Sequence, residues 1–216
     1  MKLISINIGQ ERTLQRKDRT EQTGIFKLPV THAVMVTTLG LDGDVVMDKK
    51  NHGGVDQAVY VYGAGDYAWW SRELGKDILP GTFGENLTIA ELESAQFNIG
   101  DYLHVGDVTL QVTAPRIPCK TFAARMEDPY WVKKFRHAER PGLYCRILKE
   151  GFVNAGDTVS VEKYSGETIS ILQAYREYYV RDKTEEMIRR QLNAPIDIRS
   201  RRSLEDDLQQ LLESAM

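Results

Sequence analysis

The sequence VTLQVTAPRIPCK, residues 108–120, carries the clearest structural signal in the chain. Val108, Leu110 and Val112 alternate with polar residues, which predicts a β-strand with one buried face. The strand should end at Pro115, because proline cannot donate a backbone hydrogen bond to a sheet. Cys119 then lies in a short loop that two prolines stiffen, directly after a strand. Loops held by a rigid scaffold often carry functional residues.

Short strands and turns are predicted on both sides of this stretch, from residue 1 to about 163. The alternation at residues 4–8 and the β-branched and aromatic run AVYVY at 58–62 indicate further strands. Asn-x-Gly-Asp occurs at 98–101 and again at 154–157, and both copies are typical of turns between strands. One short helix is expected at 65–74. The overall pattern favours a mainly β fold, as a barrel or a sandwich.

Tryptophan and acidic residues characterise the expected helix at 65–74. Asp66 is predicted as its N-cap, because aspartate side chains accept hydrogen bonds from the first free amides of a helix. The pair Trp69 and Trp70 is expected to cover the core from this helix.

Helical spacing replaces the strand pattern after Tyr164. It occurs in three segments, at residues 169–180, 184–192 and 203–216. Thr184 and Ser203 are predicted N-caps, each followed by acidic residues that suit the helix dipole. A unit of about 50 residues is marginally stable alone. We therefore expect it to dock on the β domain or on a second copy of the chain, in a homodimer.

Composition restricts the class of protein. The net charge of −3 over 216 residues argues against nucleic-acid binding, since no basic surplus is present. No apolar run approaches the roughly 20 residues that cross a bilayer, and the N-terminus lacks the apolar core of a signal peptide. Two cysteines are too few for a disulfide framework. These features predict a cytoplasmic protein without nucleic acid or membrane as partner.

Cys119 is the first candidate for chemistry. A thiol acts as nucleophile or soft-metal ligand when it is ionised, and nearby cations lower its pKa. Arg116 and Lys120 supply such cations if they point the same way. The alternative is a small buried residue, which is what most free cysteines are. That alternative is favoured for Cys145, which lies among apolar residues in GLYCRIL at 142–148.

Two glycine-containing loops are the next candidates. NHGGVD at 51–56 can turn with positive φ and present backbone amides to an anion, close to Lys49 and Lys50. GEN at 84–86 places polar side chains between a turn and a strand. Both loops could equally be ordinary turns. At this point a cysteine hydrolase with Cys119 as nucleophile and His52 as base also remains open.

Taken together, these stretches resemble the MOSC domain family, and specifically its YiiM-like branch. The matching segments are NHGGVDQAVYVY, GTFGENLTI, IGDYLHVGDVTLQVTAPRIPC and RPGLYCRILKEGFVNAGDTV. The resemblance implies a MOSC β-barrel domain at 1–163 and a three-helix C-terminal extension at 164–216. It also implies that Cys119 is tied to the molybdenum cofactor, as a ligand of the metal or as a carrier of sulfur.

The resemblance further implies a set of cofactor-binding residues. These are Asn51, His52, Gly53, Gly54, Asp56, Gly84, Glu85, Asn86 and Arg116, with Lys120 beside the cysteine. The implied function is reduction of N-hydroxylated compounds, such as hydroxylated purine bases. A separate reductase would supply electrons, since two cysteines cannot hold a four-thiolate iron–sulfur cluster. The alternatives are a sulfur carrier that uses a Cys119 persulfide and a non-catalytic module that binds or delivers the cofactor.

Overall fold

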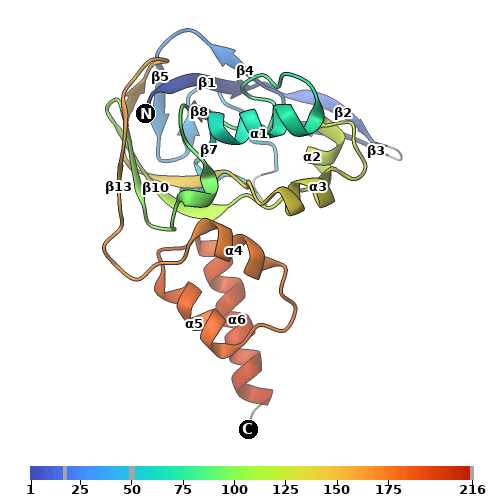
Figure 1. The fold of residues 1–216 in the computed structure, drawn as a ribbon, viewed down its shortest axis with the longest axis vertical. Helices are drawn as coiled ribbons and strands as arrows, with labels where there is room; N and C mark the ends of the chain where they lie inside the picture. Colours follow the sequence, from blue (N-terminus) through green and yellow to red (C-terminus); the bar gives the residue numbers. More distant parts are fainter. Residues whose placement is uncertain (17–18, 49–51, 215–216) are drawn as a thin grey trace.

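The chain folds into a strand-rich unit with a cluster of three helices packed below it (Figure 1). The computed structural model describes residues 1–16, 19–48 and 52–214. Helix accounts for 31% of the described residues and strand for 30%, so the fold is a mixed one and richer in helix than the predicted mainly β fold. The C-terminal helices were expected, and further short helices beside the sheet account for the rest of the difference.

One large sheet organises the strand-rich unit. In spatial order its strands are β13 (Val159–Glu162), β9 (Tyr102–Val105), β10 (Val108–Pro115), β11 (Leu143–Lys149), β7 (Val59–Gly63), β8 (Leu87–Ile89), β1 (Leu3–Gly9) and β4 (Lys27–Val30). β7 and β8 run parallel, and the other neighbouring pairs are antiparallel, so the sheet is mixed. The strand predicted at 108–115 is β10, a central member of this sheet.

Two smaller sheets flank the large one. The first contains β12 (Gly151–Val153), β5 (Val34–Thr37) and β6 (Gly40–Leu41). The second is a hairpin of β2 (Arg12–Arg16) and β3 (Arg19–Thr23) that projects from the body of the molecule (Figure 1).

The expected barrel is not confirmed. Among the described residues, no strand pairing joins the two edges of the large sheet, β13 and β4. The sheet does curl: Lys2 forms a single bridge with Thr158, and the Leu3 amide donates to the Asp157 carbonyl at 2.9 Å. These contacts bring the beginning of β1 against the segment before β13. Because β4 extends beyond β1 as a further edge strand, the sheet remains open.

Three helices accompany the sheet: α1 (Ala64–Leu74), α2 (Lys120–Arg125) and α3 (Trp131–Ala138). The helix predicted at 65–74 is therefore confirmed, but its N-cap is Gly63 and not Asp66. Asp66 lies within the first turn, where its buried carboxylate accepts hydrogen bonds from the Ser94 amide and hydroxyl and pairs with Arg140. These contacts with Ser94 and Arg140, which are distant in the sequence, replace the local capping role expected of Asp66.

The C-terminal unit consists of α4 (Ile171–Tyr178), α5 (Glu185–Asn193) and α6 (Ile198–Ser214). Thr184 caps α5 as predicted, with its hydroxyl accepting from the Met187 amide. Ser203 does not cap a helix, because α6 begins five residues earlier. The Asp197 carboxylate accepts from the Arg199 and Ser200 amides and supplies that cap instead. The unit docks on the strand-rich unit of the same chain (Figure 1).

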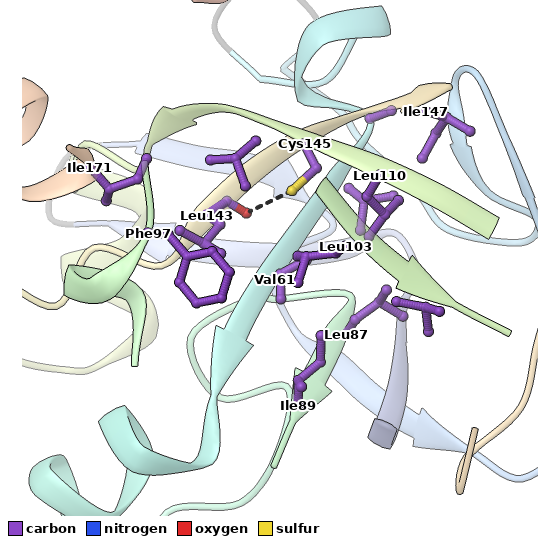
Figure 2. Close-up of a cluster of buried hydrophobic side chains, with 14 of the residues drawn as sticks. Val61, Leu87, Ile89, Phe97, Leu103, Leu110, Leu143, Cys145, Ile147 and Ile171 are labelled. Carbon is purple, nitrogen blue, oxygen red and sulfur yellow. Dashed lines mark hydrogen bonds between the residues drawn. The ribbon is translucent and has the colours of Figure 1, made fainter. Parts of the chain in front are cut away.

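Two cores hold the molecule together. The larger is aliphatic and includes residues of both units, for example Leu103 and Leu143 from the sheet and Ile171 and Leu204 from the helices; Figure 2 shows part of it. The smaller is aromatic and lies beneath α1, α2 and α3, with Trp70, Phe83 and Trp131 at its centre. None of the described helices is long and apolar enough to cross a bilayer.

Candidate functional site

Cys119 lies in the wall of a hollow of about 490 Å³ that we call the first hollow. The β2–β3 hairpin, the residues after β6, the loop before β7 and the loop after β10 surround it. Its wall includes His52 and Gly53 from the predicted His-Gly-Gly loop, and Gly84 and Asn86 from the second predicted loop. The structure therefore brings both glycine loops and the cysteine to one cavity.

The Cys119 thiol is poised for ionisation. Burial of the side chain acts to raise its pKa, but a hydrogen bond with His52 and the nearby Arg116 guanidinium outweigh that effect, with a smaller contribution from the Phe122 amide. Together they lower the pKa of Cys119 to about 7. The residue is only partly buried, so the sulfur stays within reach of a ligand. A half-ionised, accessible thiol at neutral pH is a good nucleophile and metal ligand.

Arg116 supplies the buried positive charge of the site. Its guanidinium lies 4.2 Å from the centroid of the Phe122 ring and 4.8 Å from that of Tyr60, and it donates to the Phe83 carbonyl. Burial acts to lower the pKa of Arg116, but Tyr144, Tyr60 and Cys119 raise it further than burial lowers it. The cation is thus fixed by aromatic faces while it lines the first hollow.

The His-Gly-Gly loop adopts the predicted backbone conformation. Gly53 and Gly54 have φ angles of 71° and 84°, a region that favours glycine. His52 and Gly53 line the first hollow, whereas Gly54 faces the helical unit, where an added Cβ would lie 3.7 Å from Arg199. Asn51, Lys49 and Lys50 lie outside the described residues, and the cofactor role expected of Asn51 stays a prediction.

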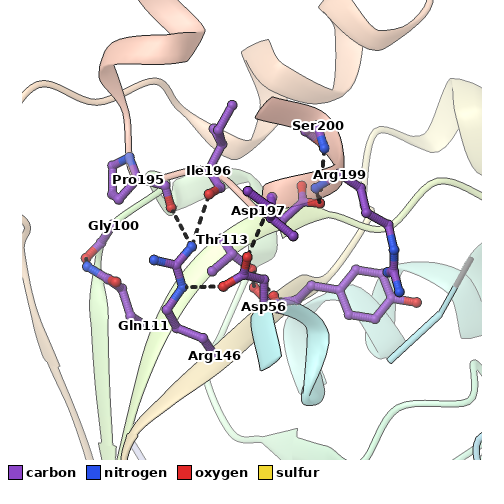
Figure 3. Close-up of polar contacts among 12 residues, drawn as sticks. Asp56, Gly100, Gln111, Thr113, Arg146, Pro195, Ile196, Asp197, Arg199 and Ser200 are labelled. Atoms are coloured by element: carbon purple, nitrogen blue, oxygen red, sulfur yellow. Dashed lines mark hydrogen bonds and ion pairs between the residues drawn. The ribbon is translucent and has the colours of Figure 1, made fainter. Parts of the chain in front are cut away.

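Asp56 has a different position from the one expected. It lies outside the wall of the first hollow, and its carboxylate accepts from the Ile198 amide at 2.8 Å and pairs with Arg146 at 3.0 Å. Arg146 in turn donates to the Pro195 and Ile196 carbonyls (Figure 3). Asp56 therefore joins the loop to the start of α6 and acts on the site by positioning the loop.

Arg199 completes this junction. Its guanidinium donates to the Gly53 carbonyl and to the Gln57 side chain, both at 3.0 Å. A basic side chain near the start of a helix is ordinarily expected to face solvent, whereas the Arg199 guanidinium is held by these two contacts. Local pattern could not reveal it, because the partners are more than 140 residues away in the chain.

The second glycine loop divides its residues between the cavity and the protein interior. Asn86 lines the first hollow, accepts from the Tyr60 amide and donates to Asp44. Glu85 does not line it: one carboxylate oxygen accepts from Tyr67, Thr88 and the Gly81 amide, and the other has no hydrogen-bond partner among the described residues. Burial raises the pKa of Glu85, although these hydrogen bonds oppose the rise.

Two further predictions concern residues near the cysteines. Lys120 begins α2, is exposed and lines neither of the two cavities that Cys119 borders. Cys145 lies in the aliphatic core between Leu110 and Leu143 (Figure 2), and burial raises its pKa. The structural role predicted for Cys145 agrees with this position.

Sequence reasoning missed two residues of the site. Lys27 lines the first hollow and pairs with Asp44; burial lowers the pKa of Lys27, and the carboxylate opposes that effect. Tyr144 lines the first hollow from β11, directly beside the buried Cys145. Strand alternation in GLYCRIL was the available signal for Tyr144, because neighbours on a strand face opposite sides. Nothing in the sequence around Lys27 marks it.

Comparison with known proteins identifies relatives of the whole arrangement. The MOSC domain model matches residues 48–160, which include both glycine loops and Cys119. The chain is 35% identical over 177 residues to the uncharacterized protein YflK of Bacillus subtilis (strain 168), covering 82% of this chain and 80% of YflK. It is 35% identical over 145 residues to YiiM of Escherichia coli (strain K12), covering 66% of this chain and 65% of YiiM.

One relative is considerably longer. A protein named Reductase from Gibberella moniliformis is 31% identical over 158 residues, which are 71% of this chain and 28% of that protein. Among solved structures, the crystal structure of YiiM from Geobacillus stearothermophilus superposes with a TM-score of 0.79 at 25% identity, covering 96% of this chain and 98% of that one. The resemblance to the YiiM-like branch, including its helical extension, is confirmed.

Proposed function

The chain belongs to the MOSC domain family, whose domains are associated with the molybdenum cofactor, and from this premise we propose that it binds that cofactor through Cys119 and reduces N-hydroxylated compounds. The observation that carries the proposal is the Cys119 thiol, with a pKa of about 7, in the wall of the first hollow. A sulfur that is ionised at neutral pH is a suitable ligand for a thiophilic metal.

The residues around the first hollow fit the cofactor in charge and size. Arg116 brings a buried positive charge to the wall, and the Lys27 ammonium, which is paired with Asp44, is a hydrogen-bond donor; both suit a phosphate-bearing ligand. A volume of about 490 Å³ lies within the range of about 300–1,000 Å³ that small-molecule sites occupy. Cys119 would hold the metal, while Arg116, Lys27 and the backbone at Gly53 would hold the anionic portion.

The chain's own side chains control protons at this site. The hydrogen bond between Cys119 and His52 stabilises the thiolate form of the sulfur. Tyr144 carries a hydroxyl on the cavity wall, and burial raises its pKa, so the group stays protonated and can donate. Bound at this site, the cofactor supplies the two-electron chemistry.

The overall reaction consumes two electrons and two protons. The N–O bond of an N-hydroxylated amine breaks, the nitrogen is reduced to the amine and the oxygen leaves as water. Electrons come from a separate flavin- or iron–sulfur-containing reductase. The relative named Reductase supports a redox context, since its match to this chain occupies 28% of its length and leaves ample room for further redox units.

Metal analysis tests the proposal. The chain is purified from cells with an intact molybdenum cofactor pathway and from cells without it, together with Cys119→Ser and Cys145→Ala. We expect close to stoichiometric molybdenum in the wild type and in Cys145→Ala, and at least about a tenfold loss in Cys119→Ser. Cys145→Ala is the matched control because that thiol is sealed in the core. Molybdenum-free wild-type protein from competent cells would end the proposal.

A sulfur carrier is the second candidate, and the same ionised thiol favours it. In this function the Cys119 thiolate would take the outer sulfur of a donor persulfide, releasing the donor as a thiolate, and would pass that sulfur on. Mass spectrometry of freshly purified protein separates the two candidates. A labile gain of about 32 Da on the Cys119 peptide, removed by a reducing agent, indicates the carrier. A molybdopterin mass that is present in the wild type and absent in Cys119→Ser indicates that Cys119 is a metal ligand. If the cofactor-loaded wild type does not reduce N-hydroxylated compounds with a competent reductase, the chain is a module that binds or delivers the cofactor.

A further inference from the structure

Cys119 borders a second hollow as well as the first. This second hollow, of about 510 Å³, lies between the loop after β10 and the helices α4 and α6. Cys119, His52, Gln57 and Tyr144 belong to the walls of both. These shared residues therefore lie between the two hollows, and we call them the partition.

The two hollows differ in chemistry. The first contains the buried cations Lys27 and Arg116, and neither of them lines the second. The second has two apolar walls, Pro115, Ile117 and Pro118 from the β10 loop and Ala174, Ile196 and Leu204 from the helical unit. Its polar groups include Lys183 and the exposed Ser203 at the rim, and Asp197 and Arg199 at the beginning of α6. The Arg199 guanidinium is already held by Gly53 and Gln57. Apolar walls on two sides suit a flat heterocycle.

The helical wall of the second hollow is fixed by the junction in Figure 3. Asp56, Arg146 and Arg199 tie the beginning of α6 to the strand-rich unit, and Ile196 and Leu204 are buried members of the common aliphatic core. Asp197 beside them is 1% exposed, and its second carboxylate oxygen has no hydrogen-bond partner among the described residues. A buried unpaired acceptor in the wall favours a ligand that carries N–H donors.

We propose that the second hollow is the substrate chamber, which takes a flat N-hydroxylated heterocycle between the β10 loop and α6 with its N–O bond toward the partition. The inference rests on the proposed function of the first hollow. It assigns selectivity for the substrate to the three-helix unit and retention of the cofactor to the β2–β3 hairpin side. Ser203 on α6 is then a residue that determines access to the chamber.

A pair of tryptophan substitutions tests this division. Ser203→Trp places bulk at the rim of the second hollow, and Gln22→Trp places it in the first; both positions are exposed, so the fold tolerates the change. Arg202→Trp is the matched control, since Arg202 is exposed, adjacent to Ser203 and lines neither hollow. The probe is 6-N-hydroxylaminopurine, titrated by calorimetry into molybdenum-loaded full chain and into chain prepared without molybdenum.

We expect Ser203→Trp to weaken binding of the purine at least about tenfold and to raise KM similarly, with wild-type molybdenum content. Gln22→Trp should lower the molybdenum content and leave purine affinity of the loaded fraction unchanged, and Arg202→Trp should change neither. Unchanged purine affinity in Ser203→Trp, in both preparations, would overturn the chamber assignment. Loss of purine affinity in Gln22→Trp alone would do the same. Because the titration does not require molybdenum, failure of the cofactor proposal is read separately from failure of this one.

Discussion

The two cysteines of this chain are positioned by neighbouring strands and have opposite properties. Cys119 follows the end of β10, and Cys145 lies in the neighbouring strand β11, paired with Val112 of β10. The pKa of Cys119 is lowered to about 7 by His52 and Arg116 despite burial, whereas burial among aliphatic side chains raises the pKa of Cys145. The pKa of each thiol is thus set by its neighbours: polar and charged groups beyond the strand end for Cys119, and aliphatic side chains on the strand face for Cys145.

Strand geometry explains why the contrast is so sharp. Successive residues on β11 point to opposite faces, so Cys145 enters the core while its neighbour Tyr144 enters the cavity wall. Beyond the last hydrogen-bonded residue of β10 this alternation no longer applies. The prolines at 115 and 118 then direct the loop, and Cys119 reaches the partition between the two hollows.

The largest expected effect is on alkylation. In cofactor-free native protein at pH 7, about half of Cys119 is thiolate, whereas Cys145 is protonated and sealed from solvent. Iodoacetamide should therefore modify Cys119 at least about a thousandfold faster than Cys145. Peptide mass spectrometry over time gives both rates, and denatured protein, in which the two rates should converge, is the control. Comparable rates in the native state would remove the contrast on which the site depends.

A smaller effect, on turnover, tests the two faces of β11. Tyr144→Phe removes the proposed proton donor and should lower kcat for the loaded enzyme by about a hundredfold, with little change in KM or molybdenum content. Cys145→Ala, one residue away, should leave kcat unchanged. Tyr130→Phe is a second control, since Tyr130 is exposed and lines neither hollow. A kcat for Tyr144→Phe equal to that of the controls would remove the tyrosine from the proton pathway.

The smallest expected effect concerns pH. The thiolate is the deprotonated form, so a lowered pKa means that alkylation of Cys119 should rise with pH around a midpoint near 7. His52→Gln removes the largest of the interactions that lower this pKa, so the midpoint should move upward. A move of about one pH unit reduces the thiolate fraction at pH 7 roughly fivefold. A midpoint that stays in place would assign the effect to Arg116 and the Phe122 amide.

The sequence anticipated the features that depend on neighbouring residues. Alternation at 108–113 located β10, the positive-φ glycines at 53 and 54 located a loop of the site, and Thr184 was found as a helix cap. Each of these signals comes from backbone preferences over a few residues. The different roles of the two cysteines were also predictable, since flanking cations and prolines contrast with flanking aliphatic residues.

Features set by distant partners escaped sequence reasoning. Asp66 accepts a hydrogen bond from Ser94 and pairs with Arg140 instead of capping its helix. Arg199 donates to the Gly53 carbonyl instead of facing solvent. Lys27 joined the site only because β4 lies at the edge of the sheet, close to Asp44. The open sheet was likewise missed, because strand periodicity does not specify how the edges of a sheet meet. The short helices α2 and α3 were also not predicted.

The hydrogen bond between Arg199 and the Gly53 carbonyl has a consequence for folding during synthesis. Residues 53 and 199 are separated by most of the chain, so the loop obtains its last brace only after the C-terminal helices have emerged from the ribosome. Under the proposed function, loading of the cofactor is therefore expected to follow synthesis of the C-terminal helices. A nascent polypeptide stalled before residue 197 would contain every strand of the sheet but would lack the Arg199 contact that holds the loop at Gly53.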